Sequence, residues 1–204
     1  MRAMRVGAVL AALVISGAAC ATARAQSPAD APGGGIVDEV RVGVLAHDVR
    51  FAGGHEPGVD LNAELDFTSP FPAEWGDALP SWASWLAHPR PVLGGDDNTA
   101  GATSDLYLAL DWTVPLSPRV LFADDRLTLD LDAGGSANNG LIGPATPERK
   151  ALGSNALFRL AGEIGWHPTP RIGVFVLFEH YSNGGTAQYN QSINDLGGRV
   201  GIRF

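Results

Sequence analysis

Cysteine is almost absent from this sequence. The one cysteine among its 204 residues is Cys20. A single thiol cannot close an intramolecular disulfide or build a cysteine-based structural zinc site, so both are excluded. Basic residues are also few, with 14 Lys and Arg against 22 Asp and Glu and a formal charge of −8. Nucleic-acid-binding proteins typically carry a basic patch or stripe, so the sequence indicates no nucleic-acid partner.

Long hydrophobic runs are missing too. Beyond residue 25, no apolar run approaches the ~20 residues that a membrane-spanning helix needs. The mean hydropathy of +0.04 is likewise too polar for a helical membrane protein. A hydrophobic content of 45% is nevertheless enough to bury a core, which argues against a disordered chain. The length predicts one domain, or at most two small ones.

The first 25 residues have the pattern of a signal peptide. Arg2 and Arg5 provide a positive start, an apolar segment follows, and residues 23–25 form a small-x-small cleavage site. We therefore predict a signal peptide at 1–25 with cleavage after Ala25. Lipidation of Cys20 is the alternative, but the residues before it lack the large aliphatic side chain expected three positions upstream.

The remainder divides into a short lead-in and one domain. Residues 26–35 end in Pro-Gly-Gly-Gly, and we expect them to be a flexible lead-in to a domain at 36–204. Three arginines leave with the signal peptide, so the mature chain has 11 basic against 22 acidic residues and a charge of −11. The exported protein contains no cysteine and needs no disulfide.

Apolar and polar residues alternate with a period of two along most of this domain. The clearest case is 59–68, where every second residue from Val59 to Phe67 is apolar and the residues between are polar. Such alternation predicts strands with one apolar face. The segment at 88–94 is the weakest, because two prolines interrupt it. The remaining segments lie at about 40–46, 105–114, 126–132, 158–167, 171–179 and 195–204.

The alternation fits two architectures. A soluble antiparallel sandwich would turn the apolar face inward. A transmembrane barrel is favoured by the signal peptide, by an even number of segments near the ~10 residues of a spanning strand, and by the aromatic end at Phe204. We therefore predict an all-β, eight-stranded antiparallel transmembrane β-barrel in the bacterial outer membrane. A barrel of this size is filled by side chains, so we expect no pore. We also expect no metal and no other cofactor.

The connections predict an orientation. Prolines mark short connections at 115–118 and 168–170, whereas those at about 133–153 and 183–193 are longer. Outer-membrane barrels have short periplasmic turns and longer extracellular loops, so we place the two long connections outside the cell.

One connection does not follow this pattern. Residues 69–87 would be a long periplasmic turn, and they contain Trp75, Trp82 and Trp85. Tryptophan prefers the headgroup level of a membrane, which favours an interfacial aromatic segment. A packed loop is an equally good interpretation.

The end of the seventh segment contains a histidine and a serine two residues apart. His180 and Ser182 have the parity of the apolar residues Val174 and Val176, so they belong to the lipid-facing side, at the outer end of the strand. Side chains two apart on one strand face are neighbours, which suits a general base and a nucleophile. A polar pair at the barrel rim without chemistry fits the same pattern.

Several longer motifs resemble the lipid A 3-O-deacylase family, which are outer-membrane barrels of acyloxyacyl-hydrolase type. The most specific is Glu179-His180-Tyr181-Ser182-Asn183-Gly184-Gly185. It is followed by Tyr189-Asn190 and by the terminal run at 196–204. Further similar segments are 38–48, 59–65, 90–91, 93–95 and 98–99.

The resemblance implies an eight-stranded barrel that hydrolyses an ester-linked acyl chain on lipid A, or lipopolysaccharide, in the outer leaflet. It implies Ser182 as the nucleophile and His180 as the general base. It further implies an oxyanion site made of the Asn190 side chain and the backbone N–H of Gly185. It implies no cofactor and no nucleic acid, and a homodimer stays open.

The third catalytic position departs from the family pattern. The acid is expected fourteen residues after the histidine, and Asn194 occupies that position. Asparagine can orient a histidine but cannot stabilise the imidazolium as a carboxylate would. Asp195 points to the lumen by alternation, unless a bulge turns it outward.

Other functions remain open from the sequence alone. A catalytically inactive barrel with a structural or adhesive role is the principal alternative to an esterase. An acyltransferase barrel would hold an acyl chain inside the lumen, and the charged lumen residues argue against it.

Overall fold

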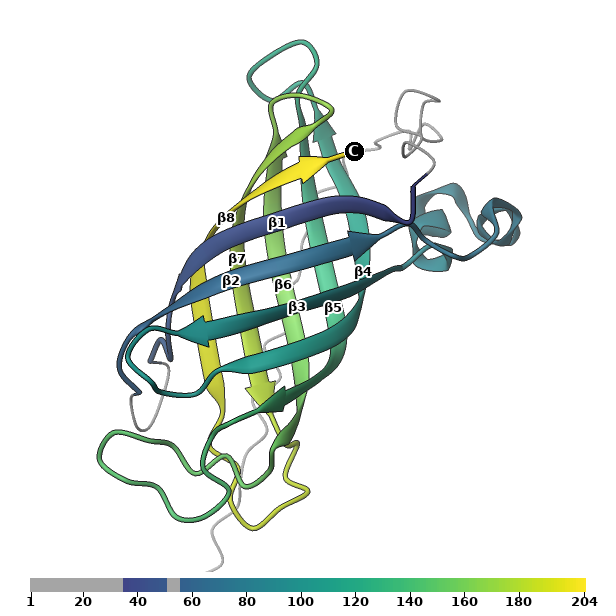
Figure 1. Ribbon diagram of the computed structural model, residues 1–204. Coiled ribbons are helices and arrows are strands. Elements are labelled where there is room, and N and C mark those ends of the chain that lie inside the picture. Colours follow the sequence, from purple (N-terminus) through teal and green to yellow (C-terminus); the bar gives the residue numbers. More distant parts are fainter. Residues whose placement is uncertain (1–34, 51–55) are drawn as a thin grey trace, which may run out of the picture.

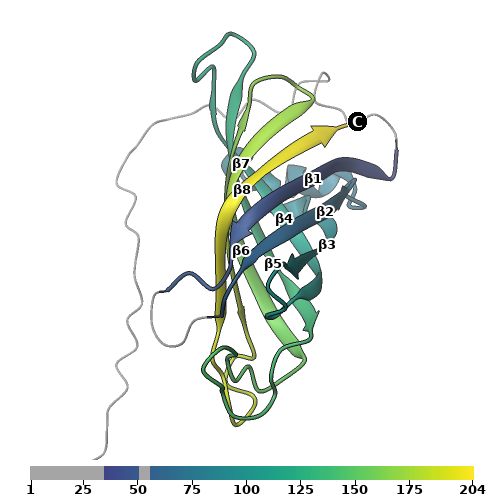
Figure 2. The ribbon, with the colours of Figure 1, turned by 60° about the vertical axis from the view of Figure 1, so that its left-hand side comes forward.

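The computed structural model describes residues 35–50 and 56–204. The predicted signal peptide, and the predicted lead-in apart from its last residue, lie outside the described residues. The described chain forms one closed antiparallel barrel in which each strand pairs with the next and β8 pairs back with β1 (Figures 1 and 2). Its strands are β1 Val37–Ala46, β2 Val59–Phe67, β3 Arg90–Asn98, β4 Asp105–Pro118, β5 Arg126–Asn138, β6 Ala156–His167, β7 Ile172–Ser182 and β8 Ile193–Arg203.

The apolar faces of the strands point outward, as the barrel prediction requires. Leu108 and Val176 are 62% and 59% exposed, and Leu61 is also exposed. Asp66 and Asp130, from the polar faces, are buried. A soluble sandwich would show the reverse, so the eight-stranded barrel is confirmed. Among the described residues, no helix is long and apolar enough to span a membrane.

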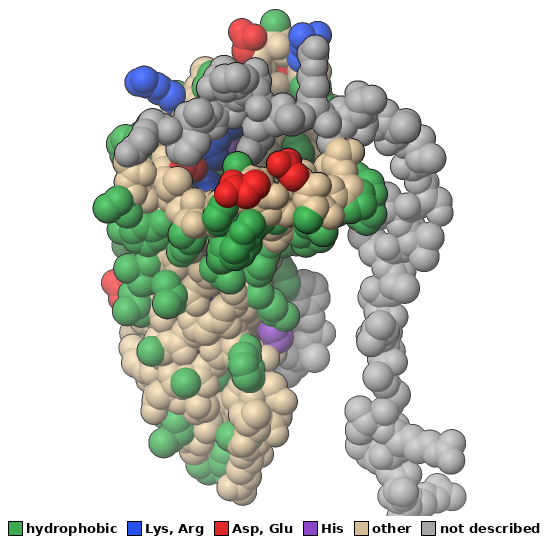
Figure 3. Space-filling view, turned by 90° about the vertical axis from the view of Figure 1, so that its right-hand side faces the viewer, with side chains coloured by type: hydrophobic (Ala, Val, Ile, Leu, Met, Phe, Trp, Pro, Cys, Tyr) green, Lys and Arg blue, Asp and Glu red, His purple; other side chains and the backbone are tan. Residues whose placement is uncertain are grey.

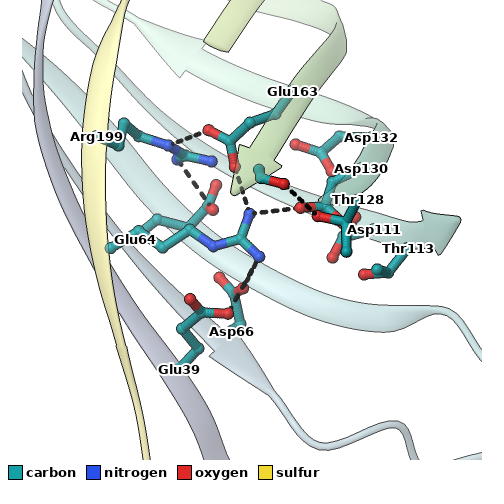
Figure 4. A network of polar contacts seen from close by, with 12 residues as sticks. Glu39, Glu64, Asp66, Asp111, Thr113, Thr128, Asp130, Asp132, Glu163 and Arg199 are labelled. Carbon is teal, nitrogen blue, oxygen red and sulfur yellow. Dashed lines mark hydrogen bonds and ion pairs between the residues drawn. The ribbon is translucent and has the colours of Figure 1, made fainter. Parts of the chain in front are cut away.

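The barrel interior is a packed network of charges (Figure 4). Arg199 contacts Glu163 at 2.6 Å and Glu64 at 2.9 Å, and Arg41 contacts the other oxygen of Glu163 at 2.6 Å. Arg159 is also buried in the interior, and its guanidinium lies 3.8 Å from the centre of the Tyr107 ring. Buried charges are tolerated only when paired, and these side chains fill the space that a pore or a lumenal acyl chain would need.

Two connections differ from the sequence prediction. The predicted turn at 115–118 is wrong, because β4 continues to Pro118 and the chain turns at 119–125. A register shift between Pro115 and Ser117 accommodates the prolines near the strand end. The predicted loop at 133–153 also begins too early, since β5 runs to Asn138. The last outward residues of β5 are Ala133, Gly135 and Ala137, which are too small to give a clear apolar signal in the sequence.

The two ends of the barrel differ in the length of their connections. We name the "loop end" after the connections at 99–104, 139–155 and 183–192, together with the described residues between β1 and β2. The "turn end" has connections at 119–125 and 168–171 and the longer segment 68–89. The weakest predicted strand, at 88–94, exists as β3 but is shifted toward the loop end.

The tryptophan-rich segment contains two short 3-10 helices, η2 Ala73–Ala78 and η3 Ser81–Ala87. They project sideways from the barrel beside β4 (Figure 1). Trp75 and Trp82 are both exposed. Trp85 is half-buried, and its Nε1 donates to the carbonyl of Trp82 at 2.9 Å.

Candidate active site

Three polar side chains meet on the outer wall where β7 and β8 reach the loop end. His180 pairs with Asn194 across the two strands, and Ser182 follows two residues along β7. His180 Nε2 lies 3.1 Å from Ser182 Oγ, and His180 Nδ1 lies 2.7 Å from Asn194 Oδ1. All three are half-buried. The structure thus brings together the three residues that the sequence selected.

The partners define the protonation pattern of the ring. An amide oxygen only accepts, so a contact with Asn194 Oδ1 requires a proton on His180 Nδ1. Nε2 is then free of hydrogen and can accept the hydroxyl proton of Ser182. This is the tautomer that a general base beside a serine needs.

Strand alternation explains why these residues share a face. Outward residues of β6 stand next to them in register, Leu160 beside His180 and Phe158 beside Ser182, and both are exposed. The polar triplet therefore lies at the edge of the apolar band. A groove of about 510 Å³ adjoins it, lined by Gly134, Gly135, Ser154, Ala156, Leu157, Phe158, Asn183 and Thr186.

The two predicted oxyanion donors lie in the connection that follows Ser182. Gly184 and Gly185 have φ values of +64° and +81°, a backbone shape that favours glycine. The Gly185 N–H donates to Asn183 Oδ1 at 2.8 Å, so it is engaged in this structure. The Asn190 oxygen accepts the Asn183 N–H at 3.0 Å, which leaves its NH₂ group as the part able to donate to a substrate.

Asn183 is a structural residue of the site that sequence reasoning missed. It is buried, and its Nδ2 donates to the carbonyl of Leu152 at 2.7 Å and that of Tyr189 at 2.6 Å. Together with its contacts to Gly185 and Asn190, this makes it the anchor of the 183–192 connection. A polar residue directly before two glycines was the available signal.

Asp195 does not reach His180. The β7–β8 pairing runs without a register shift, so Asp195 faces the interior as alternation predicts. There Asp195 Oδ1 lies 3.3 Å from His47 Nδ1 and accepts the Asp48 N–H at 2.7 Å. No bulge turns it outward, and Asn194 is the residue beside His180.

A second polar group, which sequence reasoning also missed, is buried behind the site. Potential metal-ligating atoms of His47, Asp60 and Asp195 lie within 4.8 Å of one another. These side chains already have hydrogen-bond partners within the group, since His47 Nδ1 lies 2.7 Å from Asp60 Oδ2. Burial alone would lower the pKa of His47, but hydrogen bonds to Asp195, Asp60 and Glu56 outweigh it and raise the pKa to about 12. The imidazolium therefore supplies the positive charge here.

Comparisons with known proteins find other barrels of similar fold. The outer membrane enzyme PagL has a similar solved structure, at a TM-score of 0.60 and 17% identity, covering 81% of this chain and 99% of that one. Neisserial surface protein A and a de novo designed transmembrane β-barrel each give a TM-score of 0.49, at 10% and 11% identity. They cover 81% and 85% of this chain, and 96% and 99% of their own.

No curated protein matches the chain in sequence. The comparisons also give no support to a homodimer. One family model, described as lipid A 3-O-deacylase (PagL), does match, and it covers residues 59–203. With the eight-stranded fold and this match over most of its length, the chain belongs to the lipid A 3-O-deacylase (PagL) family of outer-membrane β-barrels.

Proposed function

We propose that this protein removes an ester-linked acyl chain from lipid A by a serine esterase mechanism. The observation that supports it best is the alignment of Ser182, His180 and Asn194 on the outer wall, with both ring nitrogens of the histidine in contact. A lipid-facing position suits a substrate that never leaves the membrane. Barrels of this kind have longer connections on the extracellular side, and two of the longer ones, 139–155 and 183–192, are at the loop end, which supports a site in the outer leaflet.

The reaction starts with transfer of the Ser182 hydroxyl proton to His180 Nε2. Ser182 Oγ attacks the ester carbonyl carbon, and its π electrons move to the oxygen. The imidazolium, held through Nδ1–H by Asn194, then gives its proton to the departing lipid A oxygen. The acyl group stays on Ser182 until water, deprotonated by the same histidine, releases it as a fatty acid.

The oxyanion needs donors that point at the developing charge. The family resemblance assigns this role to the Asn190 NH₂ group and the Gly185 N–H, which lie in the connection that follows β7. Because Gly185 donates to Asn183 Oδ1 in this structure, substrate binding has to replace that bond. Such donors are typically worth about 3–4 kcal/mol each. The groove between β5 and β6 offers an apolar wall, including Phe158, to the acyl chain.

The test is mass spectrometry of lipid A from bacteria that have an outer membrane, grown with and without the protein. We expect loss of one acyl chain with the native sequence and none with Ser182→Ala or His180→Ala. Ser117→Ala, at the turn end, and His167→Gln, inside the barrel, are matched controls expected to keep activity. Heat-modifiable electrophoretic mobility verifies that each variant folds.

An inactive structural or adhesive barrel gives a different result. It predicts unchanged lipid A even with the native sequence. Full activity in Ser182→Ala would instead refute the assigned nucleophile while leaving a deacylase in place.

A further inference from the structure

The tryptophan-rich segment lies beside the barrel wall, at the depth of a lipid-facing side chain. Trp112 belongs to the outward face of β4, and its Nε1 donates to the carbonyl of Leu86 in η3 at 3.1 Å. The segment 73–87 therefore contacts the outer wall at β4 near the turn end and projects sideways from it (Figure 1). A segment in this place meets lipid on its outer side.

Its exposed surface is amphipathic. Trp82 is 72% and Trp75 54% exposed, and Leu79 and Leu86 are exposed as well. Figure 3, which faces this side of the molecule, shows acidic side chains above a gathering of hydrophobic ones. The backbone is held from within, since the ring of His88 contacts the carbonyls of Ser84, Pro72 and Ala73 at 3.1–3.2 Å.

We propose that residues 73–87 dock into the headgroup region of the lipid leaflet at the turn end. Indole rings favour this layer because their apolar body and N–H group need different surroundings. The surface is continuous with the lipid-facing band through Trp112, and the acidic side chains remain on the aqueous side. The segment thus anchors one side of the barrel at the membrane surface and fixes the depth of β2–β4 in the bilayer.

Depth-dependent fluorescence quenching tests the docking. A chain that retains Trp82 alone, with phenylalanine at 75, 85, 112 and 166, is reconstituted in vesicles of phosphatidylethanolamine and phosphatidylglycerol. We expect bromine near the headgroup end of the acyl chains to quench Trp82 at least twofold more than bromine near the bilayer centre. A chain that retains Trp112 alone is the matched control for a residue of the barrel wall.

Full quenching of Trp82 by aqueous acrylamide, with none by brominated lipid, would overturn the docking. If the fourfold variant does not fold, the difference between native protein and Trp82→Phe gives the same quantity. That single exposed substitution removes no internal hydrogen bond of its side chain that the structure shows.

A second observation concerns how Asn194 is held. The regular pairing of β1 with β8 ends at Ala46 and Leu196, so Asn194 lies beyond it. On that side its carbonyl accepts the N–H of Val49 at 2.7 Å. The N–H of Asp48 donates to Asp195 Oδ1, also at 2.7 Å. The chain after β1 thus replaces the missing ladder beside Asn194.

A buried cluster holds this part of the chain in place. His47 Nδ1 lies 2.7 Å from Asp60 Oδ2 and 3.3 Å from Asp195 Oδ1. His47 Nε2 lies 3.4 Å from Glu56 Oε2. All four are buried. Both N–H groups of the imidazolium therefore have carboxylate acceptors, which come from β2, β8 and the chain before β2.

The 139–155 connection completes the cluster from the other side. Lys150 Nζ pairs with Asp48 and donates to the carbonyl of Ser192 at 2.7 Å. The backbone N–H of Lys150 donates to Glu56 Oε1 at 2.7 Å. The segment directly before Asn194 is thus fixed to both neighbouring connections.

We propose that the His47 cluster is a positioning device that keeps Asn194 in line with His180. This inference rests on the proposed function. Without the imidazolium, the buried carboxylates of Asp60 and Asp195 would face one another without their cation, and Glu56 would keep only Arg149, whose Nε lies 3.6 Å from its Oε2. The chain at 47–49 would then separate from β8, and Asn194 would lose its partner on that side.

Kinetics and a double-mutant cycle test the positioning role. We expect His47→Gln to lower kcat of deacylation about tenfold with little change in KM, while His167→Gln, an equally buried histidine at the turn end, has no such effect. In an Asn194→Ala background, His47→Gln should cause no further loss, because the two act through one contact. Independent, additive losses would overturn the proposal.

Nitrogen-15 NMR of histidine-labelled protein gives a readout that does not depend on activity. We expect the Nδ1–H signal of His180 to shift or broaden in His47→Gln and to persist in His167→Gln. An unchanged signal would overturn the positioning role. A native protein without deacylase activity would refute the proposed function alone. Loss of the native NMR signal on treatment with EDTA would show that a metal, not the imidazolium, holds the cluster, and would also overturn the proposal.

Discussion

Replacement of Asn194 by aspartate tests how much the rate of deacylation is lowered by a neutral residue beside His180. Aspartate has the shape of asparagine, so a carboxylate oxygen would occupy the position of Oδ1, 2.7 Å from His180 Nδ1. The geometry that already orients the ring would be kept. What changes is a negative charge that stabilises the imidazolium formed when Ser182 attacks.

The magnitude follows from the distance and the surroundings. Two unit charges about 4 Å apart attract by about 4 kcal/mol at the effective dielectric constant of about 20 that suits the edge of a protein. Asn194 is half-buried, so solvent screening and the cost of placing a carboxylate near lipid reduce this gain. A net gain of about 1.4 kcal/mol corresponds to a tenfold higher rate.

The assay is the rate of fatty-acid release from lipid A in mixed micelles, for Asn, Asp, Glu and Ala at position 194. We expect Asn194→Asp to be about tenfold faster, Asn194→Glu also faster, and Asn194→Ala slower than native. The acid limb of the pH–rate profile should move to higher pH in Asn194→Asp, since the carboxylate favours the protonated ring. Equal rates for Asn, Asp and Ala would show that the residue is a bystander.

Three further predictions concern the barrel itself. Glu163→Gln removes the carboxylate shared by Arg41 and Arg199, and it should lower the free energy of unfolding by about 3–5 kcal/mol, measured by urea-induced unfolding in liposomes. A cysteine at Asn139 should react with a membrane-impermeant maleimide in intact cells; labelling only after permeabilisation would reverse the orientation. The pairing of His47 with Glu56 should stabilise the barrel most between about pH 4.5 and 6.5. Its contribution falls in acid as the pKa of Glu56, lowered from 4.5 to about 2, is approached, and falls in base because the pKa of His47 is raised from 6.5. A His47→Gln barrel with the same pH dependence of unfolding as native would contradict this.

The period-two pattern was sufficient to predict the wall of the barrel and the side of it on which the candidate site lies. Alternation fixes which residues share a face, so the parity of Val176 placed His180 and Ser182 outside, and that of Leu196 placed Asn194 beside them. Register between strands is not visible in alternation. The pairing of His180 with Asn194 depends on how tightly β7 turns into β8, which the structure supplies.

Strand ends were predicted less well, for identifiable reasons. Prolines at 115 and 118 resemble a turn, but a register shift lets them end a strand whose neighbour β5 already pairs there. Gly135 and Ala137 are small residues on the lipid-facing side, so they add no visible hydrophobic signal although they belong to β5. Both errors arise because cross-strand pairing extends a strand beyond the residues that favour it locally.

The His47 cluster was missed although its parity was readable. His47 continues the inward series of Arg41 and Leu45, and Asp60 and Asp195 are inward residues near the same end of their strands. Only closure of β8 onto β1 makes them neighbours, since more than 130 residues separate Asp60 from Asp195. A long-range contact of this kind depends on topology and not on any local pattern.

The same alternation couples the interior to the proposed chemistry. His180 lies between two inward residues, Glu179 and Tyr181, both buried. Glu179 accepts a hydrogen bond from Arg159 at 3.0 Å, and the hydroxyl of Tyr181 donates to Asp96 at 3.0 Å. The residues on either side of His180 are thus fixed by buried ion pairs and hydrogen bonds. A rigid backbone is what a site on an open, lipid-facing wall requires, because no surrounding pocket can hold its side chains in line.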